Sequence, residues 1–164
     1  MKDPTSEHKI FTTNSAQIWR NLNSFAARCL GAGLVGPYYQ ALCTLRLALE
    51  ENLSTVHEMA ITECRIQIAC EWISHGGKPL LLWAQENIGY MDVTVEDEAN
   101  YIEGGSLYDG PPTMCLRRWG FWMDRFEELG KEEFGMNEEI RKAVLEAAQA
   151  MRMIERGIAH TLSS

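Results

Sequence analysis

The sequence has few basic residues, no long hydrophobic run and no cysteine framework, and each shortage excludes a class of protein. Lys and Arg number 15 against 23 Asp and Glu, which gives a net charge of −8. A field of that sign repels phosphate backbones and anionic lipid head groups, so we expect neither nucleic acid nor membrane as a partner. The longest unbroken apolar run, Leu80 to Ala84, is far shorter than the roughly 20 residues of a membrane-spanning helix.

The 5 cysteines do not form a recognisable covalent scaffold. Their number is odd and their spacing fits neither a disulfide framework nor a metal site. Each lies in a hydrophobic stretch, where a free thiol behaves as a small core residue. Reduced thiols and a polar N-terminal segment without a secretory signal predict a cytoplasmic protein, with the nucleus as the open alternative. We expect no metal and no cofactor.

Size and composition are those of one ordinary domain. The chain has 164 residues, of which 46% are hydrophobic and 23% charged. A chain of this length buries roughly 70% of its unfolded surface, so it needs no disulfide or structural metal. Residues 1–13 show no helical period and are expected to form a flexible leader. Residues 14–160 are expected to form a single helical domain.

Apolar spacing of three and four residues predicts an all-α fold of about five to six helices. The connections are short, so neighbouring helices are expected to be mostly antiparallel in one compact bundle. The first helix should begin at Asn14 and end at Gly31. Its expected inner stripe consists of Ile18, Leu22, Phe25 and Cys29.

The third expected helix is the central one, because its apolar residues are spread around the circumference. It should follow a helix opened by Gly36-Pro37, begin with a capping box at Thr55 and stop at Gly76-Gly77-Pro79. A short separate helix is then expected from Pro79 to about Ile88.

The second half of the chain contains an irregular region and two further helices. Residues 89–110 lack a clear period, although 91–95 alternate like a brief extended piece. A helix is expected from Thr113 to Leu129, and the last one begins near Asn137. The expected inner stripe of the Thr113–Leu129 helix consists of Cys115, Trp119, Trp122, Phe126 and Leu129.

Two groups of residues could carry chemistry. Glu71 and His75 lie four residues apart on the third helix, so they can pair as an acid and a base. Arg118, Trp119 and Trp122 lie in the densest aromatic segment, where they could line a pocket and hold an anionic ligand. The alternative for the first pair is a partly exposed stripe that bonds water or neighbouring helices, and for the second set it is plain core.

Six blocks of sequence stand out along the chain: Trp19 to Arg28, Leu45 to Glu50, Glu71 to Gly77, Gly104 to Gly110, Arg118 to Phe126 and Ala147 to Glu155. Together, in this order, they resemble a fungal family catalogued as domain of unknown function thirty-six thirty-two. Tyr108 stands where that family frequently has tryptophan. The resemblance implies a helical protein of the cell interior, and it carries no activity and no site residues.

Two hypotheses for the function follow. The first is a binding or interaction module without catalysis, acting on an unknown protein or small-molecule partner and possibly as a homodimer. The second is a small cofactor-free enzyme of the cyclase or isomerase type in fungal secondary metabolism. Its aromatic pocket would be built from Arg118, Trp119 and Trp122, with Glu71 and His75 as the acid–base pair.

Overall fold

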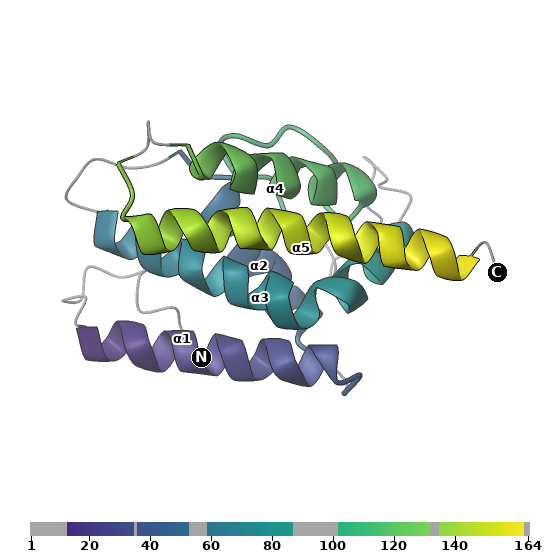
Figure 1. Ribbon diagram of the computed structural model, residues 1–164, viewed down its shortest axis with the longest axis horizontal. Helices are drawn as coiled ribbons and strands as arrows, with labels where there is room; N and C mark the ends of the chain where they lie inside the picture. The colour runs from purple at the N-terminus through teal and green to yellow at the C-terminus, as the bar shows by residue number, and fades with distance from the viewer. Residues whose placement is uncertain (1–12, 35, 53–58, 87–101, 132–134, 163–164) are drawn as a thin grey trace.

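The computed structural model describes residues 13–34, 36–52, 59–86, 102–131 and 135–162, and these form five packed helices (Figure 1). Within these ranges the regular secondary structure is entirely helical, which confirms the expected all-α class. The expected leader, the Thr55 capping box and the extended piece at 91–95 fall wholly or mostly outside the described residues. The helices are α1 (Thr13–Gly31), α2 (Tyr38–Leu49), α3 (Met59–Glu86), α4 (Leu116–Leu129) and α5 (Glu138–Leu162).

The helix α3 is central, as its all-round apolar character predicted. It contacts each of the other four helices, and Figure 1 shows it running between α1 and α5. Trp72 and Ile73 have no exposed surface at all. Burying side chains of this size supplies much of the hydrophobic free energy that holds the bundle together.

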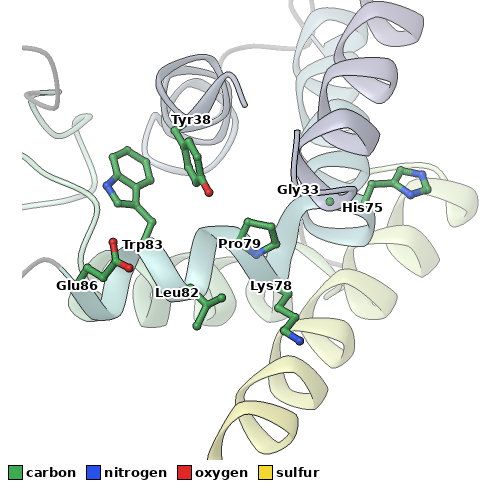
Figure 2. A pocket seen from close by; sticks show the side chains of 9 residues that line it. Gly33, Tyr38, His75, Lys78, Pro79, Leu82, Trp83 and Glu86 are labelled. Carbon is green, nitrogen blue, oxygen red and sulfur yellow. The ribbon is translucent and has the colours of Figure 1, made fainter. Parts of the chain in front are cut away.

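The predicted stop at Gly76-Gly77-Pro79 is wrong, because α3 continues through these residues to Glu86. The described part of the expected separate helix from Pro79 to Ile88 is therefore the C-terminal end of α3, up to Glu86. Pro79 has no N–H to donate to the carbonyl oxygen of His75, and a proline inside a helix bends it without always ending it. Figure 2 shows α3 changing direction at Pro79.

The glycines near this bend bring helices into close contact. A Cβ atom added at Gly31 would lie 1.9 Å from the His75 carbonyl oxygen, so α1 can approach α3 closely only with glycine there. A Cβ atom at Gly77 would lie 2.7 Å from the Cδ1 atom of Ile154 on α5. The Gly76-Gly77-Pro79 pattern, which is typical of a helix end, thus lies where α1 and α5 both come close to α3.

The predicted inner stripe of α1 is also wrong. Ile18, Leu22 and Phe25 are 52%, 39% and 69% exposed, and Cys29 is half-buried. The buried side of α1 carries Trp19, Asn23, Ala27 and Leu30 instead.

Asn23 can face the core because its side-chain amide is hydrogen-bonded there. The Nε1–H of Trp72 donates to Asn23 Oδ1 at 3.0 Å, and Asn23 Nδ2 donates to the carbonyl oxygen of Trp19 at 3.0 Å. A buried amide with such partners costs little. Small residues such as Ala27 on the same side let α1 lie close to α3.

The last two helices, α4 and α5, agree closely with the prediction from the sequence. The five residues of the predicted stripe from Cys115 to Leu129 are all buried. The helix α4 begins at Leu116, three residues later than expected. Asn137 Oδ1 accepts a hydrogen bond from the backbone N–H of Ile140 at 2.9 Å and so caps α5.

Candidate functional site

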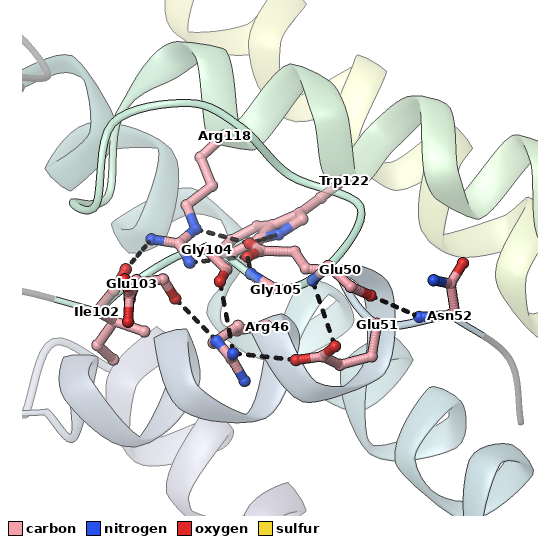
Figure 3. Close-up of polar contacts among 11 residues, drawn as sticks. Arg46, Glu50, Glu51, Asn52, Ile102, Glu103, Gly104, Gly105, Arg118 and Trp122 are labelled. Atoms are coloured by element: carbon pink, nitrogen blue, oxygen red, sulfur yellow. Dashed lines mark hydrogen bonds and ion pairs between the residues drawn. The ribbon is translucent and has the colours of Figure 1, made fainter.

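The aromatic–arginine segment of α4 lies in the core. Arg118 and Trp122 are 0% exposed. The Nε and Nη2 atoms of Arg118 donate to the Glu50 carboxylate at 2.6 and 2.8 Å, and Trp122 Nε1 donates to Glu50 Oε1 at 2.7 Å (Figure 3). The sequence suggested that Arg118 holds an anion, and the carboxylate that it contacts is the chain's own Glu50.

The same carboxylate fixes the irregular segment before α4. Gly105 N–H donates to Glu50 Oε2 at 3.0 Å, and Leu107 N–H donates to the Glu50 backbone oxygen at 2.8 Å. Arg118 Nη1 donates to the carbonyl oxygen of Ile102 at 2.8 Å. We call these four residues, together with Ile102 and Trp122, the Glu50 network. It joins the end of α2, the segment from 102 and α4 (Figure 3). The side chains of Glu50, Arg118 and Trp122 at its centre are 0% exposed, whereas Gly105 and Leu107 are half-buried.

Trp119 belongs to a different contact. It is 1% exposed, and its Nε1–H donates to Glu155 Oε1 on α5 at 3.0 Å. Trp119 and Trp122 therefore join α4 to two different helices. Glu50 was missed as a partner of Arg118 in the sequence, where the available signal was an acid directly after Leu47-Ala48-Leu49.

Glu71 and His75 do come together, as their spacing predicted. His75 Nε2 lies 3.4 Å from Glu71 Oε2, with the two side chains 35% and 37% exposed. The structure adds Ser24 of α1, whose hydroxyl donates to the same Glu71 oxygen at 2.6 Å. The hydroxyl thus bonds the carboxylate and not the imidazole, so His75 is not placed to act as a base on Ser24.

Glu71 lines a polar groove of about 410 Å³ between α1, α3 and α5. Arg20, Arg28 and Glu139 also line it, so its charges are mixed. Cys70 borders it, but burial raises the pKa of the Cys70 thiol to about 12, and a protonated thiol is a poor nucleophile. Within the described ranges no group of three His, Cys, Asp or Glu side chains is arranged to hold a metal ion.

A second cleft lies at the bend of α3, and we call it the kink cleft (Figure 2). Its volume is about 650 Å³. Tyr38 and Trp83 form an edge-to-face pair in its wall, with ring centroids 5.2 Å apart and planes at 66°. Sequence reasoning missed this cleft because it took Pro79 as the end of a helix. The lining residues are Gly31, Gly33, Tyr38, His75, Lys78, Pro79, Leu82, Trp83 and Glu86.

Comparison with known proteins identifies the family. In the part of the chain that the structure describes, no helix is long and apolar enough to cross a membrane. No curated protein and no solved structure matches the chain. The family model described as Protein of unknown function (DUF3632) matches residues 1–126, which include five of the six blocks noted in the sequence; the block from Ala147 to Glu155 lies beyond the match. The chain therefore belongs to the DUF3632 family.

Proposed function

We propose that this protein is a helical binding module that recognises a protein partner through α1 and has no catalytic activity of its own. The observation that carries the proposal is the exposure of Ile18, Leu22 and Phe25, which we call the α1 stripe. These side chains follow helical spacing on the side of α1 that faces away from α3. Contiguous exposed apolar side chains of this kind are typical of interaction sites.

The charge of α1 indicates what kind of partner would fit. Between Thr13 and Gly31 the charged side chains are Arg20 and Arg28, with no acid. Arg28 is exposed and follows Phe25 by three residues, so it borders the α1 stripe. We infer a partner helix with apolar residues at i, i+3 or i+4 and i+7, flanked by Asp or Glu.

The size of the α1 stripe favours a modest affinity. Ile18 and Phe25 are seven residues apart, which corresponds to about 10 Å along a helix, or two turns. Three side chains provide less area than a standard stable interface. A second copy fits less well, because each copy has a net charge of −8 and would bring a second α1 whose charges are again two arginines.

Three features support binding rather than catalysis. The aromatic pocket of the enzyme hypothesis would need Arg118, Trp119 and Trp122, and these are at most 1% exposed. Ser24 bonds Glu71 rather than His75. The raised pKa of Cys70 keeps its thiol protonated at neutral pH. The cyclase or isomerase alternative therefore has less support.

The five free cysteines fit the proposed cytoplasmic location.

The test is selection of peptides from a displayed library of random 15-residue sequences. Wild-type protein and the Ile18→Ser/Phe25→Ser variant are screened in parallel, and the enriched sequences are compared. We expect the wild type alone to enrich acidic peptides with apolar residues at helical spacing. Equal enrichment on both proteins, or enriched peptides without acidic residues, would contradict the proposal. Native mass spectrometry showing a dimer that the variant loses would instead make a second copy the partner.

A further inference from the structure

We propose that the kink cleft binds a small aromatic molecule that carries an anionic group. The cleft lies where α3 bends at Pro79, beside the end of α1 and the start of α2 (Figure 2). None of its lining residues belongs to the α1 stripe, so this inference does not depend on the proposed protein partner.

The shape of the cleft follows from the backbone. Pro79 redirects the C-terminal end of α3, and Gly33, with φ of 75°, lets the chain leave α1 sharply. Leu34 N–H donates to the carbonyl oxygen of Cys29 at 3.1 Å and holds this turn. The resulting volume of about 650 Å³ falls within the roughly 300–1,000 Å³ of most small-molecule sites.

The wall of the cleft offers aromatic surface that the core covers only in part. Trp83 is half-buried, whereas the other four tryptophans are buried. Tyr38 is 36% exposed and Leu82 is 42% exposed, so this end of the cleft presents apolar surface to solvent. Figure 2 shows the Tyr38 hydroxyl directed toward Pro79. A planar ring entering here can stack on the indole or pack edge-on against the tyrosine.

The charged side chains lie at opposite ends and so predict the orientation of the ligand. Lys78 and His75 lie on the side of Pro79 away from Trp83, while Glu86 lies next to Trp83 (Figure 2). His75 already has Glu71 at 3.4 Å, and Lys78 is exposed without an ion pair among the described residues. An anionic group therefore fits at Lys78, with the ring toward Tyr38 and Trp83.

The test uses two fluorescent probes that differ in charge. The anionic probe is 8-anilinonaphthalene-1-sulfonate, and the neutral one is N-phenyl-1-naphthylamine, which has the same rings without the sulfonate. We expect one anionic probe to bind per chain and to quench tryptophan fluorescence. Trp83→Leu should weaken both probes about tenfold. Lys78→Gln should weaken the anionic probe about threefold and leave the neutral probe unchanged.

Two further variants keep the test decisive. Leu82→Glu places an acid at an exposed wall position, where the fold should tolerate it, and it should abolish binding of the anionic probe. Phe25→Ser removes an exposed aromatic side chain that does not line the cleft and should change nothing. The proposal is overturned if the probes fail to bind, or if Phe25→Ser weakens them while Trp83→Leu and Leu82→Glu do not.

Discussion

The helices α1 and α4 have similar apolar stripes in the sequence, and the fold uses them in opposite ways. The stripe of α4 is fully buried, and its Arg118 and Trp122 share an internal acceptor, Glu50. The stripe of α1 faces solvent, while Asn23 on the other side of that helix is buried. The difference shows that internal hydrogen-bond partners and close helix approach select the buried side as much as hydrophobicity does.

The same comparison separates residues that stabilise the fold from residues proposed to bind a partner. The most recognisable motif, from Arg118 to Phe126, builds the core through the Glu50 network. The α1 stripe is apolar surface that the fold leaves uncovered. Changes to the first should therefore act on stability, and changes to the second on binding.

The largest effect is expected from Glu50→Ala, which leaves Arg118 charged and buried without its carboxylate. Breaking a buried ion pair in this way should reduce the free energy of unfolding by about 5 kcal/mol. Urea denaturation measures the loss. Glu51→Ala is the matched control, since the Glu51 side chain is 34% exposed and its ion pair with Arg46 is worth at most about 1 kcal/mol. Equal losses for the two variants would refute the buried network.

Trp122→Ala is expected to come next. The side chain is 0% exposed, so its removal leaves a cavity and should cost about 3–5 kcal/mol. It also removes a hydrogen bond to Glu50, so its effect should not add to that of Glu50→Ala. Thermal unfolding of both single variants and the double variant tests this. A melting temperature within a degree of the wild type would rule out the burial described here.

Asn23→Ala tests the buried side of α1. It deprives the Trp72 indole N–H of its acceptor and should cost about 1–3 kcal/mol. Denaturant unfolding gives the magnitude, and near-ultraviolet circular dichroism reports on the tryptophan environment. Asn21→Ala is the control on the exposed side of the same helix. If Asn21→Ala reduced the free energy of unfolding more than Asn23→Ala, the side of α1 described here as buried would be the wrong one.

The smallest effect is expected from Ile18→Ser/Phe25→Ser. These side chains are 52% and 69% exposed, so each substitution should change stability by no more than about 0.5 kcal/mol. Ala27→Leu, at a 0% exposed position of α1, should instead cost about 1–3 kcal/mol through overpacking. Calorimetry compares the stabilities of the two variants directly. A larger loss of stability for the serine variant would mean that the α1 stripe is buried against the rest of the protein.

Local signals in the sequence predicted much of the fold. Three predictions drew only on residues close together in the sequence, and all three are confirmed. They are the buried stripe of α4, the cap at Asn137 and the central place of α3. The continuation of α3 through Pro79 was missed because it depends on tertiary packing that the sequence does not display: Leu80 and Leu81 are buried beyond the proline, and Trp83 contacts Tyr38 of α2.

The candidate site likewise contains contacts that the sequence could predict and contacts that it could not. The Glu71–His75 pair follows from four-residue spacing on one helix. Ser24 is 47 residues from Glu71, and Glu50 is 68 residues from Arg118, so neither partner could be read from spacing. The kink cleft depends on where three chain segments meet, which only the tertiary structure shows.

Hydroxyl-radical footprinting with mass spectrometry tests the central contrast most directly, because it reads the solvent exposure of both stripes in one experiment. We expect strong oxidation at Phe25 and Leu22 and protection of Trp119 and Trp122 until the protein unfolds. Protection of Phe25 together with rapid oxidation of Trp122 in the folded protein would contradict this contrast.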